Sequence, residues 1–137
     1  MRSKLAMKMI VVALASIAHS AWAGEECSLS TLSGDYLMTG TAIGFEGYDA
    51  RVIVGVATAD GKGGLSTRET QSRNGVITRS AFNGTYTLEA DCTGVMTAGE
   101  GHWDLVLTKD GEEGVFIRTD PGTQVTRTIK RRSPRSI

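Results

Sequence analysis

Apolar and polar residues alternate in short runs along most of this chain, and glycine-rich segments separate the runs. In residues 102–108, Trp103, Leu105 and Leu107 share one face, and valines occupy alternate positions in residues 50–59. A period of two residues is that of a β-strand whose two faces lie in different environments. The alternation therefore predicts an all-β chain, with no helical period after residue 23.

Turn signals divide the alternating pattern into eight or nine strands. Asn74-Gly75 and Asn83-Gly84 predict tight hairpin turns, because both central positions of such turns need a positive φ. The candidate strands cover residues 33–43, 50–59, 65–72, 76–82, 85–90, 95–98, 102–108, 115–119 and 123–129. We expect the polar run at residues 65–72 to be well exposed. An antiparallel up-and-down β-barrel of about eight strands is the economical fold, since closure removes exposed edges, and a sandwich is the alternative.

Residues 1–23 have the pattern of a secretory signal peptide. Three basic residues precede an apolar run at residues 9–18, and Ala21-Trp22-Ala23 is a small-x-small cleavage site. The apolar run is too short to span a bilayer, and no later stretch is long enough either. We expect an exported protein that begins at Gly24, in the periplasm or at the cell surface or exterior of a Gram-negative bacterium. A buried helix or membrane anchor is the alternative.

Two cysteines, Cys27 and Cys92, follow the predicted cleavage site. In an exported protein they most simply form one disulfide bond, although both could stay free. The bond would close a loop of about 66 residues and stabilise the fold by about 4 kcal/mol in a chain-entropy account. It would join the start of the exported chain to the segment at residues 83–97, which carries the central predicted hairpin.

Charge is unevenly distributed along the chain. Without the three basic residues of the predicted signal peptide, twelve basic and fifteen acidic residues remain, a formal charge of −3. Five of those twelve fall in the last eleven residues, which hold no acid: Arg127, Lys130, Arg131, Arg132 and Arg135. We therefore expect a barrel domain at residues 24–130 and a basic tail at residues 131–137. The acidic domain has no basic face with interleaved aromatic residues, so we expect no nucleic-acid binding.

Several short motifs together resemble those of small exported bacterial proteins of uncharacterised function. They are Gly34-Asp35-Tyr36, Asp60-Gly61-Lys62-Gly63, Asn74-Gly75, Gly84-Thr85-Tyr86-Thr87 and Asp91-Cys92-Thr93-Gly94. That group is similar to the allene oxide cyclase and dirigent barrels, and more loosely to lipocalins. The resemblance covers roughly the middle half of the chain and implies an eight-stranded antiparallel barrel with a lumen. No catalytic residue of the cyclases matches a position of this sequence.

Few residues could carry catalysis or bind a metal. Glu100, His102 and Asp104 fall on one face of a strand and could bind a divalent metal, but a solvated outer face opposite Trp103 and Leu105 explains them better. His102 is the only histidine after residue 23, so a Ser-His-Asp triad would depend on it. We favour the outer face and expect no metal, no cofactor and no catalytic residue.

The apolar strand faces suggest what the barrel could do instead. In a closed barrel Tyr86, Leu88, Trp103, Leu105 and Leu107 would point inward, where we expect them to bind a ligand. The hypothesis is a non-catalytic exported barrel that binds a small apolar ligand or a partner protein. The alternatives are a cyclase-like enzyme and a surface or periplasmic structural protein with a filled barrel. An enclosed apolar cavity of ~300 Å³ or more would favour the ligand.

Overall fold

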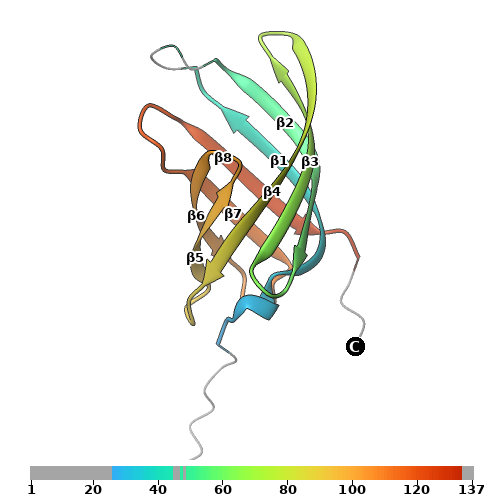
Figure 1. Cartoon of the computed structure of the whole chain (residues 1–137), viewed down its shortest axis with the longest axis vertical. Coiled ribbons are helices and arrows are strands. Elements are labelled where there is room, and N and C mark those ends of the chain that lie inside the picture. Colours follow the sequence, from blue (N-terminus) through green and yellow to red (C-terminus); the bar gives the residue numbers. More distant parts are fainter. Residues whose placement is uncertain (1–25, 45–46, 48, 134–137) are drawn as a thin grey trace, which may run out of the picture.

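Eight antiparallel strands, each paired with the next, form a closed barrel in which β8 also pairs with β1 (Figure 1). The strands are β1 (Ser33–Ala42), β2 (Arg51–Asp60), β3 (Gly64–Arg73), β4 (Val76–Leu88), β5 (Thr93–Ala98), β6 (Gly101–Leu107), β7 (Glu113–Arg118) and β8 (Val125–Arg131), and a short 3-10 helix, η1 (Leu29–Thr31), precedes them. The predicted fold class is confirmed.

This computed structural model describes residues 26–44, 47 and 49–133. The predicted signal peptide and residues 134–137 of the predicted tail lie outside the described residues. Within those ranges, no helix combines the length and the hydropathy that crossing a bilayer requires.

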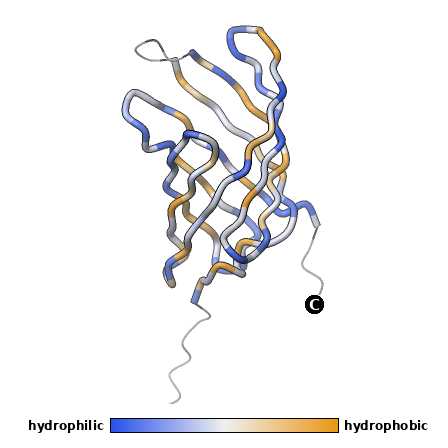
Figure 2. The backbone as a smooth tube through the Cα atoms, in the orientation of Figure 1, coloured by the Kyte–Doolittle hydropathy of each residue, from blue (hydrophilic) through white to orange (hydrophobic). Residues whose placement is uncertain are grey.

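The period of two residues places one face of each strand inside the barrel. Hydrophilic and hydrophobic positions alternate along the strands in Figure 2. Along β6, every second residue is buried, and Trp103, Leu105 and Leu107 expose at most 5% of their surface. The buried cluster draws one or more residues from every strand. The barrel interior is therefore the hydrophobic core.

Asn74-Gly75 forms the predicted tight turn, with φ values of 48° and 84°. The turn predicted at Asn83-Gly84 is wrong, because β4 runs through both residues from Val76 to Leu88. Gly84 serves another purpose. A Cβ atom there would overlap the Thr97 carbonyl oxygen on β5, so glycine allows the close approach of the two strands.

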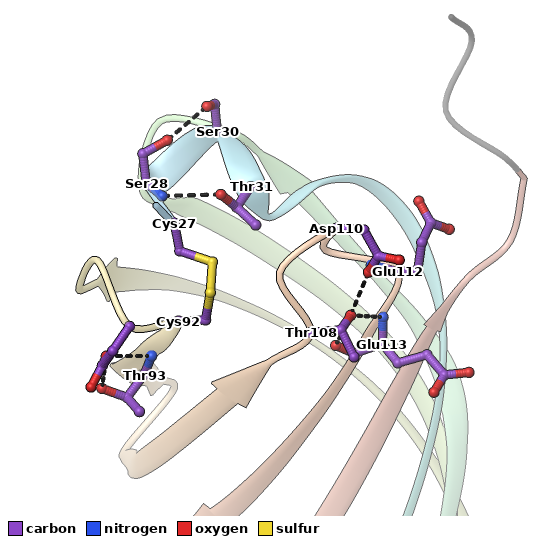
Figure 3. The surroundings of a disulfide bond; sticks show 11 residues. Cys27, Ser28, Ser30, Thr31, Cys92, Thr93, Thr108, Asp110, Glu112 and Glu113 are labelled. Carbon is purple, nitrogen blue, oxygen red and sulfur yellow. Dashed lines mark hydrogen bonds between the residues drawn. A yellow bond between two sulfur atoms is a disulfide. The ribbon is translucent and has the colours of Figure 1, made fainter. Parts of the chain in front are cut away.

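We call the end of the barrel that carries η1 the proximal end, and a disulfide bond anchors it. Cys27 and Cys92 are bonded, as the sequence predicted, and both are buried (Figure 3). The backbone N–H of Cys27 also donates to the carbonyl of Ala90, at 3.0 Å. The segment before β1 is thereby held against the turn between β4 and β5.

Two buried tyrosines fasten the same end. The Tyr86 hydroxyl lies 2.9 Å from the carbonyl oxygen of Leu29 and 2.8 Å from that of Leu32, so it holds η1 against the barrel. The Tyr36 hydroxyl donates to the carbonyl of Gly111, at 2.8 Å. Burial raises the pKa of Tyr86, since the phenolate would lose its hydration.

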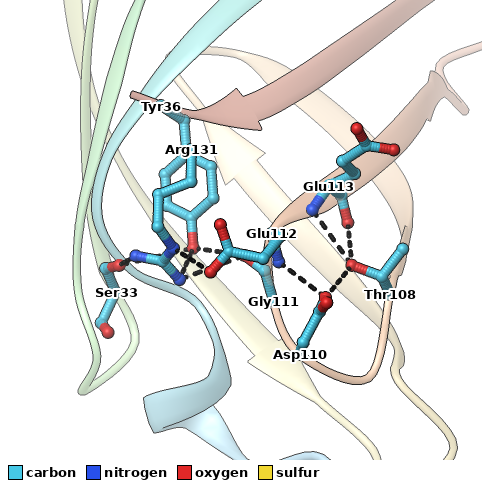
Figure 4. A network of polar contacts seen from close by, with 8 residues as sticks. All are labelled: Ser33, Tyr36, Thr108, Asp110, Gly111, Glu112, Glu113 and Arg131. Carbon is cyan, nitrogen blue, oxygen red and sulfur yellow. Dashed lines mark hydrogen bonds and ion pairs between the residues drawn. The ribbon is translucent and has the colours of Figure 1, made fainter. Parts of the chain in front are cut away.

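Arg131, which the sequence placed in the basic tail, is instead the last residue of β8. Its side chain is 6% exposed, lies over the Tyr36 ring and bonds Glu112 at 2.8 Å (Figure 4). Arg127 and Lys130 also belong to β8. Among the described residues of the predicted tail at residues 131–137, Arg131 alone is thus part of the barrel wall.

The close approach at Gly84 gives a direct test of the corrected strand. Gly84→Val should lower the free energy of unfolding by about 3 kcal/mol, because the new side chain would push β4 away from β5. Thr85→Val, at the exposed neighbouring position, should change it by less than about 0.5 kcal/mol. Urea denaturation of the two variants compares them. Equal stabilities would mean that β4 and β5 do not meet at Gly84.

Candidate functional site

The proximal half of the barrel interior is filled by side chains. The enclosed cavity there measures about 20 Å³, and its lining includes Leu32, Tyr36, Met38, Phe116 and Ile129. That volume is room for about one water molecule, far below the roughly 300 Å³ at the low end for ligand pockets. This half of the interior therefore has no space for an enclosed ligand.

The five predicted ligand-binding residues all point inward or pack against the core. Tyr86, Trp103, Leu105 and Leu107 are buried, and Leu88 packs against them from a partly buried position. Tyr86 uses its hydroxyl to hold η1, so it belongs to the proximal end. Trp103 differs from the others because its ring contacts guanidinium groups. The inward orientation is confirmed, and the ligand-binding role stays a prediction.

A buried ion pair occupies the barrel interior beyond the filled half. Arg127 of β8 and Glu69 of β3 meet at 2.7 Å (Nη1 to Oε2) and 3.4 Å (Nη2 to Oε1). Their side chains are only 12% and 3% exposed. The expectation that residues 65–72 are well exposed is therefore wrong, since Thr67 and Glu69 point into the core. Burial lowers the pKa of Arg127, and the Glu69 carboxylate opposes that shift.

Trp103 stacks against this pair and carries an unused donor. The Arg127 guanidinium lies 4.8 Å from the centre of the Trp103 ring, and that of Arg118 lies 6.0 Å away. A Cβ atom on Gly101 would fall 2.9 Å from the indole nitrogen, so glycine leaves room for it. Among the described residues, the buried Nε1 of Trp103 and Nε of Arg127 have no hydrogen-bond partner. Buried donors without an acceptor are rare and costly.

More guanidinium groups gather at the distal end, which we define as the end opposite η1. Arg51 donates to Gln71 at 3.2 Å, and Arg73 faces Asp49 across 3.9 Å. The pKa of Arg51 is lowered by burial first, and then by the positive charges of Arg73, Arg118 and Arg127. Arg51 and Arg73 are paired across β2 and β3, and Arg118 and Arg127 both approach the Trp103 ring. We call Arg51, Arg73, Arg118 and Arg127, together with Trp103, the distal cluster.

Asp120, in the connection between β7 and β8, fixes one side of the distal cluster. It accepts from Arg118 Nε at 2.6 Å and from the His102 backbone N–H at 3.0 Å, and its other oxygen lies 2.7 Å from His102 Nδ1. These contacts, that of Arg118 foremost, hold the pKa of Asp120 far below its usual range. Asp120 therefore carries its negative charge at physiological pH.

The candidate metal-binding residues are not brought together. His102 is exposed on the outer face, where it pairs with Asp120, and Glu100 and Asp104 are also exposed. In the described ranges, no group of three or more histidine, cysteine, aspartate or glutamate side chains could hold a metal ion.

The distal cluster is suited to binding an anion. Its four guanidinium groups face three carboxylates (Asp49, Glu69 and Asp120), which leaves a formal charge of +1 within an otherwise acidic protein. Guanidinium groups donate in a planar fork that matches carboxylate and phosphate. Sequence reasoning predicted Trp103 but missed the four arginines, because they lie on separate strands. The signal that could have found them is that each has the inward parity of its strand.

No protein-family model, curated protein or solved structure matches the chain.

The buried ion pair makes a testable contribution to stability. Glu69→Leu should lower the free energy of unfolding by about 3–5 kcal/mol, because it leaves the Arg127 charge buried without a partner. The double variant Glu69→Leu/Arg127→Met should regain most of that loss, since no charge remains to be desolvated. Urea denaturation measures both. A double variant as unstable as Glu69→Leu would show that the loss comes from packing and not from charge.

Proposed function

We propose that this protein is an exported, non-catalytic binding protein whose distal cluster binds a small molecule that carries a carboxylate or phosphate group. The observation that carries the proposal is a pair of buried donors, Trp103 Nε1–H and Arg127 Nε–H, which have no acceptor among the described residues. Two more guanidinium groups, those of Arg118 and Arg51, lie near these donors. An oxyanion would accept from these donors and offset the repulsion among the arginines.

The filled interior separates this proposal from the binding of an apolar molecule. The enclosed cavity of about 20 Å³ holds no lipid-sized ligand, and the interior beyond it contains the buried Arg127–Glu69 ion pair. A cyclase-like reaction would also need an apolar site large enough to enclose a reactive lipid. The small volume of the cavity therefore argues against that alternative as well. Trp103 and Leu105 could still contact the apolar part of an anionic ligand.

The available side chains support binding and not catalysis. General acid–base and nucleophilic mechanisms need a base within hydrogen-bond reach of a nucleophile or substrate proton. His102, the one histidine after residue 23, is exposed and engages Asp120, and both cysteines are in the disulfide bond. Arginine, which stays protonated, is a poor acid or base but a good anion receptor.

Export rests on the leader pattern of residues 1–23 together with the disulfide bond. Disulfides persist in oxidising compartments such as the bacterial periplasm. An exported binding protein meets its ligand outside the cytoplasm, and the chemistry of the distal cluster limits that ligand to an anion.

Intrinsic fluorescence tests the proposal, because Trp103 would report on its own binding site. Trp22→Phe leaves Trp103 as the only tryptophan of the full chain. Titration with acetate, citrate, benzoate and inorganic phosphate should give a saturable change in emission with at least one of them, and added salt should weaken it. The carboxylates and phosphate distinguish the two ligand classes.

Matched variants then locate the binding. Arg118→Met and Arg51→Met should each weaken affinity about tenfold, since a hydrogen bond to a charged group is worth roughly 1.5–3 kcal/mol. Arg68→Met, at an exposed outward position on the same barrel, should leave affinity unchanged. The proposal fails if none of these anions changes the emission at millimolar concentration. It also fails if neutral Nile red binds with equal affinity to the parent and to Arg118→Met.

A further inference from the structure

The β3–β4 hairpin extends beyond the neighbouring strand on one side. β3 pairs with β4 over the full length from Gly64↔Thr85 to Arg73↔Val76, whereas β5 pairs with β4 only from Gly84 to Leu88. In Figure 1 the hairpin rises well past the tips of β5 and β6. The first eight residues of β4 therefore have a strand partner on one side only among the described residues.

Successive residues of an antiparallel strand direct their backbone N–H and C=O groups to opposite sides. The hydrogen bonds of β4 therefore show which residues point to its unpaired side. Tyr86 N–H donates to Gly63 on the β3 side. Odd-numbered positions face the β5 side, since the Asn83 carbonyl accepts from Gly99 and Glu89 N–H donates to Thr93. The N–H and C=O groups of Ile77, Arg79 and Ala81 thus point to the unpaired side. We call residues 77–81 the β4 edge.

Two unpaired cations lie beside the β4 edge on the outer surface. Arg79 pairs across the ladder with Thr70, and Arg68 with Ala81, so the two arginines are diagonal neighbours. They line one shallow groove, and in the described part of the chain neither makes an ion pair. Among the described residues that line this groove, Glu69 is the one acid, and its side chain points inward to Arg127.

The inward side of the same segment offers a polar group and a ring. Ser80 Oγ is buried and has no hydrogen-bond partner in the described residues. Phe82 is half-buried, two residues further along. A strand added beside β4 would place its own inward side chains next to these two. A hydroxyl or amide side chain there would satisfy Ser80.

We propose that the β4 edge docks an extended acidic segment of a partner protein, which adds to the barrel as a further strand. The backbone groups of Ile77, Arg79 and Ala81 form the hydrogen bonds to the added strand. The side chains of Arg68 and Arg79 pair with the acidic side chains of that strand. A second copy of this chain fits less well. A symmetric pairing centred on the edge would set Arg79 directly opposite Arg79, and like charges in that position are destabilising.

A synthetic peptide of eight residues with glutamate at alternate positions and threonine between them is the probe. Fluorescence anisotropy of the labelled peptide should show saturable binding to the oxidised full-length protein. The same peptide with lysine for glutamate should not bind. Hydrogen exchange should show new protection of the amides of Ile77, Arg79 and Ala81 when the glutamate peptide is present. This result is independent of Trp103 emission, so the β4 edge and the distal cluster are tested separately.

Two variants separate the ladder from the charge. Ala81→Pro removes an N–H that points to the unpaired side, which an edge strand tolerates, and removes no charge; it should weaken binding about tenfold or more. Arg79→Glu should do the same through charge, whereas Lys109→Glu, at the turn between β6 and β7, should leave affinity unchanged. Equal binding by parent and Arg79→Glu overturns the proposal. So does protection of the three amides that grows with protein concentration alone, since the edge would then bind a second copy.

Discussion

Arg127 carries a charge inside a protein core, and the distal half of the barrel is arranged to accommodate it. Glu69 reaches it from β3, the Trp103 ring covers it from β6, and Gly40 on β1 leaves room, since a Cβ atom there would lie 2.8 Å from Arg127 Cγ. Desolvating an ion costs several kcal/mol, which only a close partner offsets. Four strands distant in sequence therefore depend on one interaction for their packing.

The two halves of the barrel meet different physical demands. In the proximal half, the Cys27–Cys92 bond, η1, two tyrosines and Arg131 close the end, and the hydroxyl groups of both tyrosines have hydrogen-bond partners. In the distal half, buried donors of Trp103 and Arg127 lack acceptors within the described part of the chain, and guanidinium groups repel one another. Apolar residues of similar volume would often be as stable as a buried ion pair. The retained charges thus point to a ligand, and the stable proximal half holds them in position.

Much of the fold could be predicted from sequence because strand periodicity and turn chemistry are local. The burial of Trp103, Leu105 and Leu107 followed from parity, and the disulfide bond from cysteine number and compartment. The prediction of a turn at Asn83-Gly84 was wrong because glycine is needed at residue 84 for the close approach of β5. No local sequence pattern reveals that tertiary contact. The distal cluster could not be predicted for the same reason. Glu69 lies in a run that looks solvent-exposed, and its partner Arg127 is 58 residues away.

The proposed function requires that the buried donors of the distal cluster bind an anionic acceptor. Nuclear magnetic resonance of the Trp22→Phe chain observes the Trp103 indole N–H and the Arg127 Nε–H directly. Addition of the anion should move both resonances saturably and together, because a hydrogen bond forms at each donor. Shifts confined to exposed arginine side chains, with the Trp103 indole resonance unmoved at saturating anion, would contradict the account.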